Sequence, residues 1–232
     1  MEPPMKLLDW ISMGKLNWGR LSINPNAAHL LDQFPDDHIN WKWLSANQND
    51  EAVKILEQNP DKIYWDYFSR NPNAIHLLER NPDKINWDYL SMNSSDKAIN
   101  LLERNHEKIS WNALSFNKND HALNLLENNL DKINWIFFSD NPNEKAIKLL
   151  ENNQDKICWD RLSRNPNGLA LLKQNQELIH WYWLSQNPSI FEIDYPLMAK
   201  QRNAILLQEL MEVTWHPERP FTQWYLNEMD EF

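Results

Sequence analysis

One feature limits what this chain can fold into more than any other: a tryptophan-centred unit recurs every 22 to 24 residues. The aligned tryptophans are Trp18, Trp41, Trp65, Trp87, Trp111, Trp135, Trp159 and Trp181. Self-similarity at a fixed period of this length is typical of a stacked repeat protein, in which each unit packs on its neighbours. The sequence therefore predicts one extended array with a strip-like core.

Two Asn-Pro pairs divide each unit into short helical segments. In the unit that begins at Trp65, these pairs are Asn71-Pro72 and Asn81-Pro82. Asn is a favoured N-cap residue, Pro is favoured at the first helical position, and the residue before Pro avoids the α conformation. We therefore expect Asn71 to open one helix and Asn81 to open another, each about 8–10 residues long and too short to be stable alone.

Apolar residues recur with helical spacing in both segments. Ala74, Leu77 and Leu78 form one stripe in the first, and Ile85 and Trp87 belong to a wide apolar arc in the second. A helix that is apolar over most of its girth packs on several sides. The predicted fold class is all-α: an α-solenoid of short helix-pair repeats with N- and C-terminal caps.

The repeated tryptophan has two interpretations, a ligand-stacking ladder or part of the core. We favour the core, with the indoles buried between layers, because an aromatic side chain supplies the largest apolar area. Choline-type repeats are also rich in Trp, but they need glycine-rich hairpins, and this chain has only 3 Gly.

The repeat pattern defines three regions. The array runs without a linker over residues 16–188, and residues 1–15 resemble an incomplete unit, which predicts an N-terminal cap. Residues 189–232 leave the pattern and predict a C-terminal helical cap that closes the apolar end of the stack. In it we expect a helix from Met198 to about Val213 and a shorter one around Phe221 to Asn227.

A leucine-rich-repeat horseshoe is the closest competing fold, since its unit has a similar length. It would need an L-x-L strand beside its asparagine, whereas Asn-Pro recurs here. A strong β signal in circular dichroism would favour the horseshoe.

Composition narrows the class of partner. The net charge of -10 argues against nucleic acid and against anionic membrane surfaces, because both are bound through Lys and Arg. The single cysteine, Cys158, excludes an intrachain disulfide and fits a reducing setting. The start of the chain lacks the apolar run of a signal peptide. We expect a cytoplasmic protein.

The sequence offers no catalytic constellation. A serine recurs four residues after each Trp, but no His or Asp stands at a fixed offset to activate it. We therefore expect its hydroxyl to bond carbonyls at the helix end. The seven histidines show no metal-ligand spacing, and three glycines cannot build a phosphate loop. We expect no enzymatic activity, cofactor or metal.

Glu and Lys recur on either side of the second Asn-Pro boundary, as in Glu79 and Lys84. Both change together in the seventh unit, to Lys173 and Leu178. We therefore expect these residues to form ion pairs across the turn.

The candidate binding residues occupy the position two residues after each Trp. This slot holds Arg20, Trp43, Tyr67, Tyr89, Ala113, Phe137, Arg161 and Trp183. It varies while its neighbours do not, yet aromatic residues and Arg dominate, and these types are enriched at binding hot spots. We predict that Trp43, Tyr67, Tyr89, Phe137, Arg161 and Trp183 grip a protein or peptide along one face. The alternative is that they only fill gaps between repeats.

The chain resembles proteins with tandem Trp–Leu repeats found in giant double-stranded DNA viruses. The matching residues are the repeated motif I-N-W-D-x-L-S-x-N-P-N-A-I-x-L-L-E-x-N-P-D-K and, after it, His216-Pro217-x-Arg219 and Tyr225-Leu226. The resemblance spans about Leu16 to Leu226, although the residue before Pro220 and the spacing to Tyr225 depart from the family pattern. It implies a viral protein, located in the host cytoplasm or the virion, and brings no established reaction, cofactor or binding residue.

Two functions follow from these observations. The first is a non-enzymatic interaction or scaffold protein, because solenoids present extended surfaces. The second is a structural component of a virus particle or assembly, which stoichiometric abundance in purified particles would favour. The sequence leaves the partner and the oligomeric state open.

Overall fold

The computed structural model describes residues 6–31 and 38–214. The regular structure of these residues is entirely helical, with α-helices, short 3₁₀ turns and no strand. The chain divides into two units, Met1–Pro188 and Ser189–Phe232. The first consists of successive short helix pairs, which confirms the predicted all-α repeat fold.

Each repeat contributes one helix that begins at the recurring tryptophan of that repeat. These Trp helices are α1 (Trp18–Leu21), α3 (Trp41–Ser45), α5 (Trp65–Ser69), α7 (Trp87–Ser91), α9 (Trp111–Leu114), α11 (Trp135–Phe138), α13 (Trp159–Arg164) and α15 (Trp181–Leu184).

The second helix of each pair carries the Leu-Leu stripe. These helices are α2 (Ala28–Leu31), α4 (Asp50–Gln58), α6 (Ile75–Arg80), α8 (Asp96–Arg104), α10 (Asp120–Glu127), α12 (Glu144–Glu151) and α14 (Leu169–Gln174).

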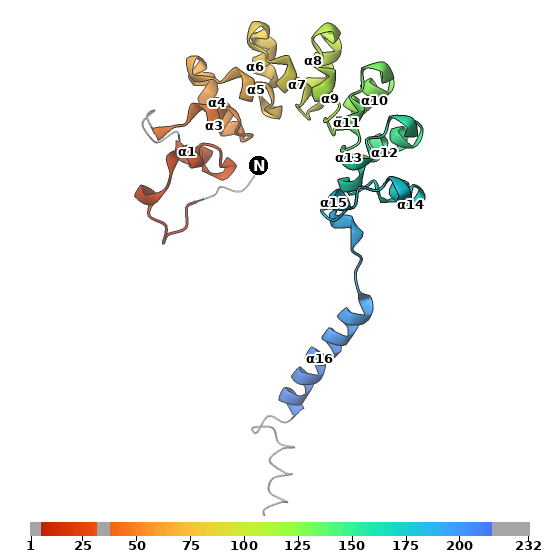
Figure 1. The fold of residues 1–232 in the computed structure, drawn as a ribbon. Coiled ribbons are helices and arrows are strands. Elements are labelled where there is room, and N and C mark those ends of the chain that lie inside the picture. Colours follow the sequence, from red (N-terminus) through yellow and green to blue (C-terminus); the bar gives the residue numbers. More distant parts are fainter. Residues whose placement is uncertain (1–5, 32–37, 215–232) are drawn as a thin grey trace, which may run out of the picture. The chain divides into compact units, whose positions relative to one another are not determined.

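The repeats stack as two layers. Trp helices contact the next Trp helix, as α3 with α5, α5 with α7 and α7 with α9, while α6 contacts α8 and α8 contacts α10. Within the first unit, the Trp helices from α5 to α15 lie on the inner side of a curve and the second helices on its outer side (Figure 1). Each layer is therefore continuous from repeat to repeat, which places the variable slot along one side of the stack.

The core runs between the layers as a strip. Leu90 from α7 and Leu102 from α8 are fully buried, together with Ala98 and Ile99. The tryptophans from Trp18 to Trp159 are only half-buried and pack against this strip from its edge, while Trp181 is exposed. The expectation that the indoles are buried between layers is thus wrong in degree, because the leucines occupy the centre and the larger indoles lie at the margin.

The second Asn-Pro boundary departs from expectation. Asn81 does not cap a following helix; its side-chain amide donates to the carbonyl of Leu77, four residues back, at 2.9 Å. Pro82–Lys84 then forms a 3₁₀ turn, and Ile85 is extended, so the expected single helix is split before α7. Equivalent turns are Pro60–Lys62, His106–Lys108, Leu130–Lys132, Gln154–Lys156 and Gln176–Leu178.

The residue after the extended Ile85 has a defined structural role. Asn86 follows Ile85 in the β conformation, and its side chain accepts a hydrogen bond from the Tyr89 N–H at 3.2 Å. This is the geometry of an N-cap, which satisfies one of the donors at the start of α7. Asn17, Asn40 and Asn134 cap their Trp helices in the same way.

A serine column ties consecutive repeats together. Each serine four residues after the Trp donates its hydroxyl to the Trp carbonyl, as expected, at 2.7 to 3.0 Å. The same hydroxyl accepts the backbone N–H that precedes the next Trp; Ser69, for example, accepts from Asn86 at 3.0 Å. Serines from Ser22 to Ser163 are fully buried in this role.

An asparagine ladder runs beside the serine column and is buried from Asn47 onwards; it comprises Asn24, Asn47, Asn71, Asn93, Asn117, Asn141, Asn165 and Asn187. The Asn93 amide donates to the carbonyls of Ser69 and Asn71 in the preceding repeat, at 3.1 and 3.0 Å. Its oxygen accepts from the Ser95 N–H at 3.0 Å. Asn71 opens a 3₁₀ turn that leads into α6, as predicted, whereas Ser95, two residues after Asn93, is the N-cap of α8.

The predicted Glu–Lys pairs are wrong. Lys84 lies 3.6 Å from its neighbour Asp83, and Glu79 pairs with Arg104 of the next repeat at 2.7 Å. Lys132 and Lys156 likewise contact the preceding aspartates. The 3₁₀ turn brings each lysine beside the acid next to it, and the glutamate faces the following second helix instead.

The second unit contains α16 (Tyr195–Thr214), so the helix expected from Met198 begins three residues earlier. The Asp194 side chain accepts from the Leu197 N–H at 2.9 Å and caps it. The shorter helix expected around residues 221–227 and the His216-Pro217 motif lie outside the described residues. None of the helices in the described ranges is long and apolar enough to span a membrane.

Candidate binding face

All six predicted binding residues lie near the start of Trp helices and are half-buried. In α7 the buried side is formed by Leu90 and Ser91, while Asp88 is exposed and Tyr89 lies between these two sides. The slot is therefore at the border between the core and solvent. A side chain there packs on neighbours and still presents part of its surface.

Three of the six form one contiguous group, which we call the aromatic triad: Trp43, Tyr67 and Tyr89. The ring centroids of Trp43 and Tyr67 are 6.4 Å apart, and those of Tyr67 and Tyr89 are 6.0 Å apart. The ammonium of Lys42 lies 5.0 Å from the Tyr67 centroid. Three successive repeats thus join into one aromatic surface with a cation beside it.

The row is interrupted in the next repeat. The slot there holds Ala113, which is only 5% exposed. Beyond it, Phe137 stacks on Phe116 with centroids 4.3 Å apart and rings tilted by 30°. The predicted single face is therefore divided into separate aromatic groups.

Trp183 belongs to a third group at the end of the array. The guanidinium of Arg164 lies 5.8 Å from its ring, and Tyr182 packs against it edge-on at 4.9 Å. Arg164 is held by two hydrogen bonds to Asp140, and this carboxylate raises the pKa of Arg164 above its usual value. Arg161 makes no ion pair or ring contact within the described residues, so the structure does not join it to either neighbour.

Sequence reasoning missed Phe116 and Arg164, which lie five residues after a tryptophan. This position holds Ile23, Ala46, Arg70, Met92, Phe116, Asp140, Arg164 and Gln186. It varies as widely as the predicted slot, which is the signal that could have identified it. Two of these side chains contact the slot residue of the next repeat: Phe116 contacts Phe137, and Arg164 contacts Trp183.

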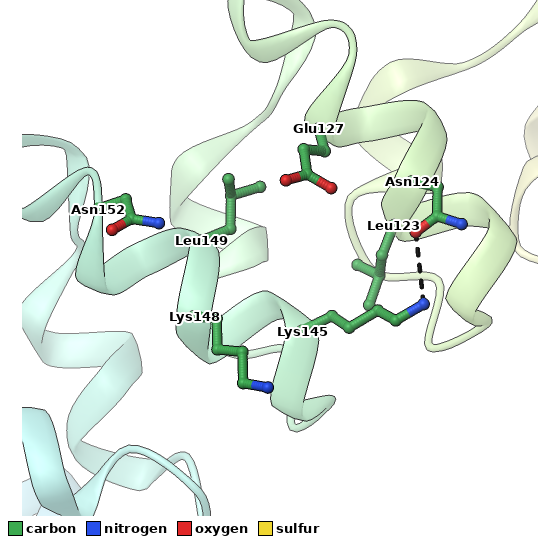
Figure 2. Close-up of a pocket in the computed structure, with 7 residues that line it drawn as sticks. All are labelled: Leu123, Asn124, Glu127, Lys145, Lys148, Leu149 and Asn152. Carbon is green, nitrogen blue, oxygen red and sulfur yellow. Dashed lines mark hydrogen bonds between the residues drawn. The ribbon is translucent and has the colours of Figure 1, made fainter.

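The outer side of the stack carries a shallow pocket of about 220 Å³ between α10 and α12. Its floor includes Leu123 and Leu149, and polar side chains surround it (Figure 2). The Lys145 ammonium donates to the side-chain amide oxygen of Asn124 at 3.3 Å and also pairs with Asp120. The charge of Lys145 is thus paired across the repeat boundary, while Glu127, Lys148 and Asn152 also line the pocket.

The described residues contain no group of His, Cys, Asp and Glu placed to hold a metal. The column serines from Ser22 to Ser163 are not accessible to a substrate. Their hydroxyls from Ser22 to Ser163 are buried and bonded on both sides, as donor to a Trp carbonyl and acceptor from the next repeat.

Comparison with known proteins adds no relative to this description: no family model, curated protein or solved structure matches the chain.

Proposed function

We propose that the array is a non-enzymatic binding or scaffold module whose protein partner lies along the Trp-helix layer. The aromatic triad is the observation that carries this proposal. Its rings come from three consecutive repeats, contact one another and remain half-exposed.

The chemistry of the triad suits recognition. Trp and Tyr are enriched among residues that dominate binding energy, because they bury a large area in a defined geometry. Packing against the neighbouring repeat already restricts these side chains, so little further conformational entropy is lost when a partner binds. The contacts among the three rings already hold the triad in place before a partner binds.

The spacing favours an extended segment as the partner. A strand advances about 3.2–3.4 Å per residue, and alternate side chains point to the same side. Two residues of such a segment therefore cover about 6.4–6.8 Å, close to the separations of 6.0 and 6.4 Å between ring centroids in the triad. Alternate side chains of the partner would meet successive rings.

The setting is part of the proposal. The single cysteine fits a reducing cytoplasm, and the repeated motif fits a viral origin, in the host cell or the particle.

A displayed library of linear peptides, selected on the full chain, tests the binding proposal. We expect enriched peptides to lose at least about tenfold in affinity, or about 1.4 kcal/mol, towards a variant with Trp43→Ala, Tyr67→Ala and Tyr89→Ala. The matched control is Phe116→Ala with Phe137→Ala, which removes rings from the same layer elsewhere.

Thermal unfolding of both variants separates binding from stability. If the triad variant keeps its fold and binds the peptides with unchanged affinity, the face is packing alone and the proposal is wrong. The same conclusion follows if the library yields no peptide that distinguishes the two variants.

A further inference from the structure

The two ends of the array present opposite halves of the interface that joins its repeats. At the C-terminal end, Ser185 is exposed, whereas the equivalent serines from Ser22 to Ser163 are fully buried beneath the next repeat. Trp181 is 66% exposed, while the preceding tryptophans of the column are half-buried. Within the first unit, this end therefore offers a hydroxyl acceptor and an apolar ring that no further repeat covers.

The N-terminal end offers the donors. Asn24 is exposed, whereas the seven later members of the asparagine ladder are 0% to 3% exposed. Its oxygen accepts from the Asn26 N–H at 3.0 Å, as in the other repeats. Its amide group, which elsewhere in the ladder binds the preceding repeat, makes no hydrogen bond within the part of the chain that the structure describes. The backbone N–H of Asn17 likewise lacks the serine that such an N–H reaches in later repeats.

We propose that a second copy of this chain stacks head-to-tail on the first and continues the ladder. In the register of the interior interfaces, the Asn17 N–H of one copy would donate to the Ser185 hydroxyl of the other. The Asn24 amide would donate to the Ser185 carbonyl. This extends an interface that the array already forms at each of its internal boundaries.

The side chains that cover the exposed ring are also present. Within the array, Trp18 is covered by His38, which lies three residues before the next Trp, with ring centroids 5.7 Å apart. In the first repeat this position is Lys15, which is exposed. Stacked on Trp181 of another copy, its aliphatic stem would cover the indole and its ammonium would lie near the ring face.

The complementarity is directional. Two C-terminal ends bring acceptors against acceptors, and two N-terminal ends bring donors against donors. Only unlike ends match, and an interface between unlike surfaces that does not close into a ring builds an open series of oligomers. The inference is independent of whether the aromatic triad binds a peptide.

Sedimentation velocity on full-length variants tests the inference. Asn24→Asp keeps the oxygen that caps Pro25–Ala27 but replaces the amide donors with a carboxylate that repels carbonyl oxygens. Ser185→Arg obstructs the other end. We expect the unmodified chain to form dimers and longer series as its concentration rises. Each variant alone should remain monomeric, and an equimolar mixture should form dimers and nothing larger, because one intact end remains on each variant.

Matched control variants place the same charges one residue away from Asn24 and from Ser185. Ile23→Asp and Gln186→Arg alter the position that holds Asp140, Arg70 and Arg164 inside the array, so both should assemble like the unmodified chain. An unmodified chain that stays monomeric at all concentrations, with its ends covered from within the same chain or by water, would overturn the inference. So would dimers of Asn24→Asp alone, which would require like ends to pair.

Discussion

At the scale of single residues, the asparagine ladder holds the repeats in register. Asn93 is fully buried, and its amide group donates to two carbonyls of the preceding repeat while its oxygen orients the turn of its own. A buried amide is stable only when its groups are bonded. The ladder therefore favours one alignment of each repeat on the last.

Asn93→Ala tests this role. Two buried carbonyls lose their donor, at a cost of about 1–3 kcal/mol each, so we expect a loss of about 2–6 kcal/mol in the free energy of unfolding. Chemical denaturation measures it. Asn100→Ala, on the exposed side of α8, should change stability by less than about 0.5 kcal/mol; equal losses would contradict the role given to the ladder.

A second residue-scale prediction concerns Asp120. The hydrogen bond from the Asn143 amide, and then that from Lys145, lowers the pKa of its carboxyl below the usual value. Because the pKa is lower when folded, ionised Asp120 stabilises the fold above its ordinary pKa, and this contribution disappears as the pH falls through the lowered value. Asn143→Ser keeps an N-cap for α12 but removes the amide donor.

Carboxyl-detected NMR titration should therefore show the pKa of Asp120 rising towards its ordinary value in Asn143→Ser. Asp131, which is not bonded to Asn143, serves as the internal reference. A midpoint for Asp120 that stays where it is in the unmodified chain would exclude the Asn143 hydrogen bond as the main cause.

At the scale of elements, the sequence predicts the helix pairs and the first boundary of each repeat, and it misses the second. The 22–24-residue period, the Leu-Leu stripe and Asn71-Pro72 are local signals that survive in the structure. The extended conformation of Ile85 is not set by a local sequence signal. It is set by the packing of the Ile85 side chain, which is 8% exposed, into the strip between the layers. Sequence alone also locates the slot residues but not their grouping, since Phe116 meets Phe137 only across a repeat boundary.

The division of the core between leucine and tryptophan predicts an order of stability effects. Leu90→Ala empties a fully buried site and should cost about 2–5 kcal/mol. Trp87→Ala removes a half-buried ring and should cost less than the ~3–5 kcal/mol of a buried aromatic. Urea unfolding of the two variants compares them, and a clearly larger loss for Trp87→Ala would mean that the indole is part of the central strip.

At the scale of the whole molecule, the first unit is held together by contacts between neighbouring repeats. Such an array need not unfold as one body, because its stability is close to a sum of repeat and interface terms. A lesion in the middle should therefore spread to adjacent repeats before it reaches the distant ones.

Leu114→Lys places a charge at the C-terminal end of α9, where Leu114 is fully buried. Hydrogen exchange should show faster exchange in α7, α9 and α11 and nearly native protection in α3 and α4. Asn112→Lys, with an exposed side chain on the same helix, is the control. Uniform loss of protection across the array would show that the repeats unfold as one cooperative body.

The constant offsets along each repeat have a consequence for how such chains can change over time. In every repeat the serine follows the tryptophan by four residues and the ladder asparagine by six, while differences in length fall elsewhere. Any unit can therefore follow any other with its hydrogen bonds intact. A gene that duplicates or loses one whole unit still encodes a chain in which the hydrogen bonds between repeats can form. The length of the array and the order of its surface residues are therefore free to diversify by recombination.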